Sequence, residues 1–354
     1  MKIAVGLSGG VDSAVAALLL ARQGHEVVGV TMRLWKEGLY KGGCRDACFG
    51  PGEEEDIAAA EAFAKRLGIG YEVFDCSDEY ERTVIGYFRR EKAAGRTPNP
   101  CTVCKPRLKF GLLPELAARR VGFDRFATGH YARTAETGGG RVAVARAADA
   151  KKDQSYFLWG LSQEQIARTV FPLGGLAKAE VRRIAAEAGL PMAGKPDSQD
   201  FYSGDSAELT GLADEPGDIV DTGGRVLGRH NGCWRYTVGQ RKGLGIGGGT
   251  PYYVLRIERA SNRVVVGARG EGTVGEFKVR DVNWMGAAPT TEPVEGFVKI
   301  RSNGEPVGPA RLEGGDTVRV EGGLFGVAPG QSAVLYDGEG RVLCGGVIGD
   351  FGAG

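Results

Sequence analysis

Hydrophobic positions in the first part of the chain form short apolar runs that alternate with helical patterns. The runs that indicate buried strands are residues 2–7, 25–32 and 71–76, with a fourth inside 125–132. Apolar residues recur at helical spacing over 11–24 and 53–68, and a glycine ends each pattern. Strands that alternate with helices pair in parallel, so this part predicts a doubly wound α/β sheet. Ligands of such sheets bind at the carboxyl ends of the strands.

The pattern changes after residue 204. Glycine turns then separate short β runs, and towards the C-terminus apolar and polar residues alternate between turns. Alternation with a period of two predicts half-buried strands. We therefore expect a catalytic α/β domain over 1–204, a small β-rich domain over 205–272, and a β-barrel over 273–354. The two β domains could grip something large.

The composition is that of an ordinary globular protein. The chain has 354 residues, of which 42% are hydrophobic and 25% are charged. It has no uncharged apolar stretch of about 18 residues, so no membrane span is expected. The N-terminus, MKIAVGLSGG, lacks the cleavage region of a secretory signal, which makes the cytoplasm the expected compartment. The 7 cysteines are too few and too scattered for a disulfide framework.

Positive charge is concentrated around one cysteine pair. The net charge is +1, but from Arg82 to Arg120 there are ten Lys or Arg and two acidic residues, a local charge of +8. Cys101 and Cys104 lie inside this run, in PNPCTVCKPRLKF. Most charge runs are solvated helix faces. Here the charge would also lower thiol pKa values and attract phosphate, so this segment is a candidate site.

The hexamer SGGVDS, residues 8–13, lies between the first strand and the first helix. Its glycines let the backbone approach a ligand, and a helix N-terminus offers unpaired N–H groups to phosphate. Asp12 would sit poorly beside bare phosphate, so we expect it to act through Mg²⁺. The chain has no G-x-x-x-x-G-K-[ST], which excludes a Walker-type loop. The plainer alternative is a tight turn with serine as the helix cap.

This hexamer resembles the pyrophosphate loop (PP-loop) of the N-type ATP pyrophosphatases, an adenine-nucleotide α-hydrolase-like superfamily that cleaves ATP to AMP and pyrophosphate. Further motifs narrow the resemblance. In chain order they are GRTPNPCTVCKPRLKFG, ATGHYAR, KKDQSYFLWGL, FPLGGLAKAEVRRIA, KPDSQDF, YTVGQRKGLGIGG and APGQSAVLYDGE. Together they resemble the tRNA-specific 2-thiouridylase (MnmA) family over nearly the whole chain.

The resemblance implies a tRNA-uridine 2-sulfurtransferase. In this family ATP adenylates O2 of the wobble uridine, and a sulfur carried as a cysteine persulfide displaces AMP. The base must be flipped out of the anticodon loop to reach the site. The implied partners are tRNA with a wobble uridine and a sulfur donor, either a persulfide carrier or sulfide, but neither a membrane nor DNA. Two alternatives stay open: a paralogous PP-loop tRNA-modifying enzyme with another target, and a tRNA-binding protein that has lost thiolation.

The resemblance also implies roles for single residues. The implied ATP site comprises Gly6, Leu7, Ser8, Gly9, Gly10, Val11, Asp12 and Ser13, with Met32 beside the adenine and Gly129 closing the pocket. Cys104 matches the catalytic nucleophile, and Asn99, Pro100 and Cys101 match the segment that meets the target base. The implied tRNA-contacting residues are His130, Lys152, Asp153, Gln154, Lys299, Ile300 and Gln331.

Some of these residues have plainer interpretations. His130 could be a core histidine that is hydrogen-bonded to a carbonyl. Lys152, Asp153 and Gln154 could begin a helix, with the aspartate as its cap. Gln331 could be a turn residue that follows a Pro-Gly pair.

The resemblance fails at the second catalytic cysteine. The family pattern D-S-x-x-x-C-F places it where this chain has Tyr202, and a tyrosine cannot resolve a persulfide. In one account, Cys101 and Cys104 form the dithiol couple instead. In a second account, which we favour, they ligate a [4Fe–4S] cluster together with Cys44 or Cys48. In a third account these four cysteines bind structural zinc. Cys44 and Cys48 could also be bystanders.

Overall fold

The computed structural model describes residues 1–42, 47–194, 200–247 and 251–350. A five-stranded sheet forms its N-terminal layer. In spatial order the strands are β4 (Gly70–Asp75), β2 (Glu26–Arg33), β1 (Lys2–Gly6), β5 (Arg125–Thr128) and β8 (Thr169–Val170). All pairings are parallel and β1 lies in the middle, which confirms the doubly wound α/β prediction. The sequence did not indicate β8, because a strand of two residues is too short to show a hydrophobic period.

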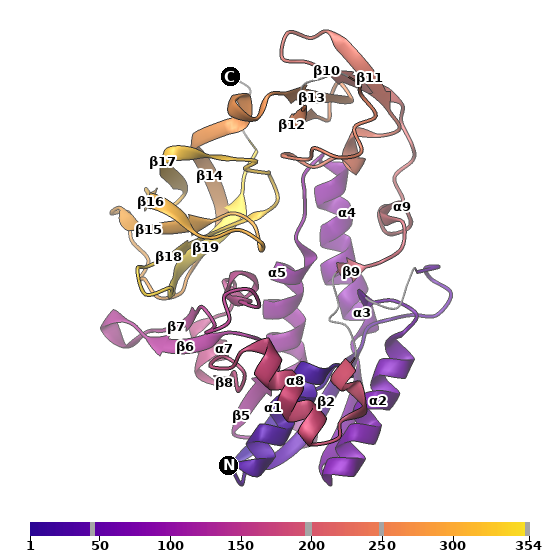
Figure 1. Ribbon diagram of the computed structural model, residues 1–354, viewed down its shortest axis with the longest axis vertical. Coiled ribbons are helices and arrows are strands. Elements are labelled where there is room, and N and C mark those ends of the chain that lie inside the picture. The colour runs from indigo at the N-terminus through magenta and orange to yellow at the C-terminus, as the bar shows by residue number, and fades with distance from the viewer. Residues whose placement is uncertain (43–46, 195–199, 248–250, 351–354) are drawn as a thin grey trace.

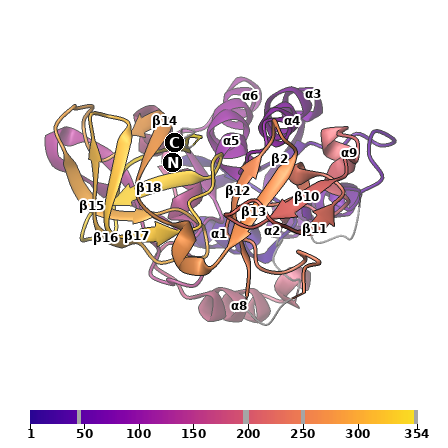
Figure 2. The ribbon, with the colours of Figure 1, turned by 90° about the horizontal axis from the view of Figure 1, so that it is seen from above.

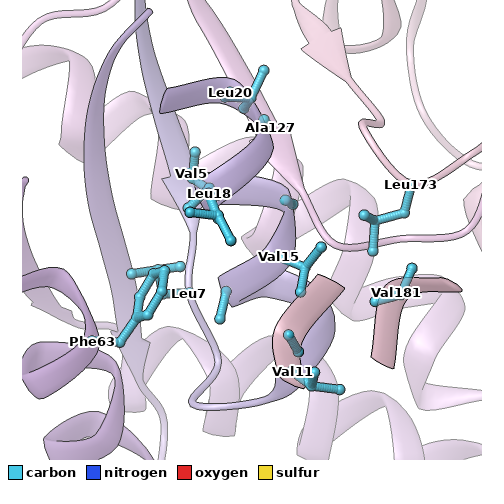
Figure 3. Close-up of a cluster of buried hydrophobic side chains, with 14 of the residues drawn as sticks. Val5, Leu7, Val11, Val15, Leu18, Leu20, Phe63, Ala127, Leu173 and Val181 are labelled. Atoms are coloured by element: carbon cyan, nitrogen blue, oxygen red, sulfur yellow. The ribbon is translucent and has the colours of Figure 1, made fainter. Parts of the chain in front are cut away.

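The core beside β1 joins this strand to three helices. These are α1 (Val11–Arg22), α2 (Glu53–Leu67) and α8 (Lys178–Glu187). Figure 3 shows their apolar side chains together: Val5, Leu7, Val11, Val15, Leu18, Phe63 and Val181. α1 is rich in alanine, valine and leucine, and most of its side chains are buried. The phosphate-loop hexamer therefore ends on a helix that is packed firmly into the domain.

The basic run from Arg82 to Arg120 is helical almost throughout. It is preceded by α3 (Ser77–Tyr80), and its first half comprises a π-helical turn (Glu81–Ile85) and α4 (Gly86–Ala93). The second half comprises α5 (Pro100–Cys104), a π-helical segment (Lys105–Leu112) and α6 (Leu113–Arg120). Such π-helical stretches are rare and are frequent at functional sites. The second one directly follows the cysteine pair.

Two small strand pairs complete the N-terminal region. β3 (Ala47–Phe49) pairs in parallel with β9 (Asp200–Tyr202), and this pairing brings together two segments that are distant in the chain. β6 (Arg133–Glu136) and β7 (Val142–Ala145) form an antiparallel hairpin. The short helices are a 3₁₀ turn (Ser155–Leu158), α7 (Gln163–Ala167) and α9 (Ser206–Thr210).

The rest of the chain forms two β structures, as the sequence predicted. The smaller is a sheet in the order β11 (Val226–His230), β10 (Gly217–Val220), β13 (Arg263–Gly267) and β12 (Tyr253–Glu258). The larger is a closed barrel in the order β14 (Thr273–Trp284), β17 (Thr317–Phe325), β16 (Val307–Glu313), β15 (Val294–Lys299), β18 (Ser332–Tyr336) and β19 (Val342–Ile348). Closure leaves the barrel without an unpaired edge.

The two β structures lie at the opposite end of the molecule from the parallel sheet, and α4 and α5 extend between the two ends (Figure 1). Viewed from above, the barrel and the small sheet lie side by side (Figure 2). The rings of Tyr253 and Phe325 meet there with centroids 5.2 Å apart. Within the described residues, no helix is long and apolar enough to cross a membrane.

Candidate active site

The phosphate-loop hexamer forms a closed turn between β1 and α1. The Ser8 N–H donates to the Ser13 Oγ at 3.2 Å, and the Ser13 hydroxyl donates to the Gly10 carbonyl at 3.1 Å. Gly9 has a φ of +68°, and a Cβ on it would lie 2.5 Å from the Asp56 carbonyl oxygen. No described side chain caps the N-terminus of α1. The first-turn N–H groups of this helix are thus suited to bind phosphate.

Gly129 lies directly against this turn. It follows the last residue of β5, and a Cβ on it would lie 2.6 Å from both the Asp12 carbonyl carbon and the Ser13 nitrogen. Only glycine allows this approach of two backbones. Met32 lies at the carboxyl end of β2, half-buried, with the sheet register pairing Gly6 with Val30. The structure therefore brings the hexamer and Gly129 together, and it places Met32 at the same end of the sheet.

Asp12 is paired with a lysine that the sequence analysis missed. The Lys178 Nζ lies 2.7 Å and 2.8 Å from the two carboxylate oxygens of Asp12, and the Tyr131 hydroxyl donates to one of them at 2.9 Å. Lys178 is buried at the start of α8. The motif FPLGGLAKAEVRRIA contained this lysine, but neither its spacing nor its composition indicated a partner so far away in the chain.

Cys101 and Cys104 lie on α5, and both are half-buried. Burial raises the pKa of the Cys104 thiol and outweighs the opposing effect of Lys109 and Lys105. Lys105 is itself buried, with its Nζ 4.5 Å from the centre of the Phe157 ring, and burial lowers its pKa. The expectation that the basic run lowers the pKa of this thiol is therefore wrong for Cys104, because desolvation is the larger effect.

The segment before α5 is tied to the barrel. The Thr97 N–H donates to the Pro329 carbonyl at 2.8 Å, and the Gln331 Nε2 donates to the Thr97 carbonyl at 3.0 Å. The Tyr87 hydroxyl donates to the Gly330 carbonyl at 3.3 Å. Gln331 is thus more than a turn residue, since its side chain holds the backbone that leads to Asn99, Pro100 and Cys101.

His130 is buried beside the cysteine helix. Its Nδ1 lies 2.8 Å from the Thr128 Oγ1, and its ring lies 5.6 Å from the ring of Phe110. Burial, together with Lys109 and Lys105, lowers the pKa of His130 well below its usual value, so the imidazole is neutral at pH 7. These contacts favour the core interpretation of His130, with a hydroxyl as the partner in place of a carbonyl.

The other implied tRNA-contacting residues lie at the junction with the barrel. Asp153 is buried and accepts hydrogen bonds from the Ala147 N–H at 3.1 Å and the Ser155 hydroxyl at 2.9 Å. The buried Lys299 Nζ lies 3.8 Å from the same carboxylate. Asp153 does not cap an α-helix, since the residues that follow Gln154 form a 3₁₀ turn.

The other three implied tRNA-contacting residues here, Lys152, Gln154 and Ile300, are chain neighbours of Asp153 and Lys299. The Gln154 side chain accepts a hydrogen bond from the Tyr131 N–H at 2.9 Å, and the Ile300 carbonyl accepts one from the Tyr156 hydroxyl at 3.3 Å. Lys152 is half-buried. Most of this group thus lies inside the junction between the catalytic domain and the barrel.

Among the remaining described cysteines, Cys76, Cys233 and Cys344 are buried and Cys48 is exposed. Cys44 lies outside the described residues. Cys76 is buried in the hydrophobic cluster against which Cys104 packs, as expected of a core cysteine. Cys48 lies on β3, and its thiol donates to the Phe201 carbonyl at 3.7 Å. Tyr202 is buried, and its hydroxyl donates to Glu208 at 2.6 Å.

Comparison with known proteins agrees with this architecture. Family models match three segments: "tRNA methyl transferase HUP domain" over residues 1–202, "tRNA methyl transferase PRC-barrel domain" over 210–268, and "Aminomethyltransferase beta-barrel domain" over 274–348. A tRNA-specific 2-thiouridylase of Endomicrobium trichonymphae is 46% identical over 98% of this chain and 99% of its own length. One from Nostoc sp. is 44% identical over 99% of each chain. The chain therefore belongs to the tRNA-specific 2-thiouridylase (MnmA) family.

Proposed function

We propose that this protein adenylates O2 of the wobble uridine in tRNA with ATP and then replaces that oxygen with sulfur, releasing AMP and pyrophosphate. One geometric relationship carries the proposal. Gly129 packs on the hexamer of residues 8–13, and the next residue, His130, packs on Phe110 of the segment that follows Cys104. A phosphate-binding turn and a thiol-bearing helix are thus joined through two consecutive residues. This arrangement suits an enzyme that activates a carbonyl oxygen and then delivers sulfur.

The activation step rests on the hexamer and Asp12. The N–H groups at the start of α1 would bind the phosphates of ATP, with Gly129 allowing the chain to close over them. A carboxylate oxygen is a suitable ligand for Mg²⁺, so Asp12 would hold the ion, which neutralises phosphate charge when bound. Lys178 forms an ion pair with Asp12 and would therefore lie close to phosphates bound at the start of α1.

The sulfur-transfer step rests on Cys104. Adenylation converts the uridine oxygen into part of a good leaving group, since AMP departs in place of oxide. A sulfur atom bound to Cys104 as a persulfide would attack C2 of the uracil, the C2–O bond would break, and AMP would leave with its electron pair. The helical segment that directly follows this residue carries the basic side chains Lys105 and Lys109, which favour an anionic substrate.

An iron–sulfur cluster lacks support from the described thiols. Thiolates are the ligands that such clusters require. Yet no three His, Cys, Asp or Glu side chains among the described residues converge as a metal site would need, and these residues include Cys48, Cys101 and Cys104. We therefore assign no step to a cluster or to zinc. Iron and labile-sulfide analysis of anaerobically purified protein tests this directly.

The small β sheet, over residues 205–272, and the barrel, over residues 273–354, are proposed as the tRNA-binding part. This proposal is supported by the contacts that join the barrel to the chain entering α5. These contacts would place a tRNA bound by the barrel near Cys104. The cytoplasm, where tRNA is found, is the proposed compartment.

The function is tested with tRNA that carries an unmodified wobble uridine, ATP, Mg²⁺ and a persulfide donor. AMP release together with 2-thiouridine at the wobble position, identified by mass spectrometry of the nucleosides, supports the proposal. Cys104→Ala should abolish thiolation and leave tRNA binding intact. Thiolation at another position would favour the paralogous enzyme. Binding of tRNA without AMP release would favour a protein that has lost thiolation.

A further inference from the structure

The β3–β9 pair places a thiol beside the position where the family pattern expects one. The register pairs Ala47 with Asp200 and Phe49 with Tyr202, so Cys48 lies level with Phe201. The Cys48 thiol donates to the Phe201 carbonyl at 3.7 Å. The thiol that the family pattern expects at position 202 on β9 is absent, but the paired strand β3 carries a cysteine.

The same pair faces the cysteine helix. Phe201 and Cys104 both pack, half-buried, against one cluster of buried side chains. Phe49 and Tyr80 are members of this cluster, with their ring centroids 4.8 Å apart. Two neighbours of the Cys48 thiol, Phe49 in the chain and Phe201 across the strand pair, therefore belong to the packing that holds Cys104 in place.

Electrostatic interactions agree with this geometry. Burial by the surrounding protein atoms and, after it, negative charge on Cys101 and Cys104 raise the pKa of Cys48 to about 12, although some of its surface is open to solvent. Burial and then the charges of Cys48, Cys104 and Cys101 also raise the pKa of Tyr80. The charge of each of the three thiols therefore acts on Tyr80, whose ring packs on that of Phe49, the residue after Cys48.

We propose that Cys48 is the resolving thiol of this enzyme and forms a disulfide with Cys104 at the end of each sulfur transfer. The proposal rests on the function proposed above. In this proposal Cys48 is the redox partner of Cys104, and Cys101 is only a neighbouring thiol. Cys101 and Cys104 are half-buried, whereas Cys48 is exposed, and a disulfide that must be reduced after every turnover needs a sulfur that a reductant can reach.

The sulfur donor supplies one sulfane sulfur, which forms a persulfide on Cys104. Its outer sulfur bonds to C2 of the uracil as AMP leaves. The Cys48 thiolate then attacks the Cys104 Sγ, the bond between Sγ and the transferred sulfur breaks, and the electron pair of that bond stays on the uracil sulfur. The Cys48 proton goes to solvent. A dithiol reductant returns two electrons and two protons to the Cys48–Cys104 disulfide.

Part of the rise in the pKa of Cys48 is removed during this sequence. Burial is its largest cause and persists, but the charges of Cys101 and Cys104 also raise it, while Lys109 and Lys105 act to lower it. When Cys104 carries the sulfur that is bonded to uracil, its Sγ has no negative charge. The thiolate of Cys48 becomes easier to form at the step that requires it.

The decisive experiment is one round of thiolation without reductant. The full-length protein is loaded with persulfide, mixed with ATP, Mg²⁺ and unmodified tRNA, quenched with an alkylating agent, and digested for mass spectrometry under non-reducing conditions. We expect a peptide that joins Cys48 to Cys104, in an amount equal to the 2-thiouridine formed. A Cys101–Cys104 disulfide in its place would overturn the proposal.

Variants give an independent test. Cys48→Ser keeps a hydroxyl that can donate to the Phe201 carbonyl, so the strand pair should be preserved. With persulfide donor and dithiol, we expect at least a tenfold loss in the rate of multiple-turnover thiolation, on the order of 1.4 kcal/mol, while AMP formation in the first turnover and tRNA affinity stay as in the wild type. Cys101→Ser should lose less than Cys48→Ser. Wild-type thiolation by Cys48→Ser, or stoichiometric iron that is lost in this variant, would refute the resolving role.

These outcomes separate the inference from the proposed function. If the wild type forms no 2-thiouridine under any of these conditions, the proposed function fails. If the wild type thiolates tRNA and Cys48→Ser thiolates it equally well, only the role of Cys48 fails.

Discussion

The side chain of Gln331 donates a hydrogen bond of 3.0 Å to the Thr97 carbonyl, four residues before Cys101. This bond joins a turn of the barrel to the chain that enters the cysteine helix, and the Thr97 N–H bond to Pro329 reinforces it. A partner that moves the barrel turn would therefore also move the start of α5. The contact gives the barrel a direct means of positioning Cys101 and Cys104.

We predict that Gln331→Ala lowers the rate of thiolation more than it lowers tRNA affinity. The variant loses a hydrogen bond worth about 1 kcal/mol, which corresponds to about a fivefold effect on the population of the positioned helix. The measurements are single-turnover thiolation, tRNA dissociation constant, and the rate of Cys104 alkylation. Glu321→Gln, on an exposed strand position of the barrel, is the matched control. A variant that loses tRNA affinity but keeps the wild-type alkylation rate would instead show that Gln331 contacts RNA.

Lys178→Met should impair the adenylation step. The substitution keeps an apolar stem but removes the ammonium group that lies 2.7 Å from Asp12, so a partly buried carboxylate loses its cation. Hydrogen bonds to charged groups are worth about 1.5–3 kcal/mol, so AMP formation should fall by about tenfold or more. Lys178→Arg, which keeps the charge, should retain more activity. Equal AMP formation by the Met variant and the wild type would show that this pair has no role in ATP chemistry.

Gly129→Ala should disrupt the ATP site. The new Cβ would lie 2.6 Å from two backbone atoms of α1, which cannot move as the tip of a flexible side chain can. Overpacking of this kind costs about 1–3 kcal/mol. We expect weaker ATP binding in calorimetry and a lower melting temperature. Gly175→Ala is the control, because a Cβ there meets nothing within 4 Å. If both variants bind ATP equally, the contact between Gly129 and the hexamer does not matter for the nucleotide.

Lys92 should give the protein a distinctive dependence of stability on pH. Its Nζ donates to the Trp234 carbonyl at 3.1 Å, and burial lowers its pKa from 10.5 to about 8. Between these two pH values the unfolded chain holds the Lys92 proton while the folded chain has released it. Raising the pH through this window therefore stabilises the folded state through this group, and below about pH 8 its penalty is fully present.

The check compares urea unfolding of the wild type and Lys92→Met across this range. The free energy of unfolding of the wild type, minus that of the variant, should rise from about pH 8 to pH 10.5 and be flat at lower pH. Subtracting the variant removes the contribution of the other titrating groups. A difference that is constant through the whole range would show that Lys92 keeps its proton when buried.

The sequence by itself determined the architecture and indicated where the proposed chemistry lies. The apolar runs that became β1, β2 and β4, the alternation that became the barrel, and the hexamer of residues 8–13 are local patterns, since each reflects the period of a strand or helix or the needs of a turn. They were readable because the residues that carry each signal are neighbours in the chain. Cys101 and Cys104 were found in the same way, from their spacing and their basic surroundings.

Only the tertiary structure decided which distant side chains meet. It also decided whether burial or a neighbouring charge controls the pKa of a group. Lys178 reaches Asp12 from 166 residues away, and Cys48 reaches Phe201 from 153 residues away. No local period encodes such pairs, because they depend on how helices and strands pack. The same holds for Cys104, where the sequence showed the lysines that lower a thiol pKa but not the burial that raises it. Desolvation is a property of the packed interior, and it appears only when the chain has folded.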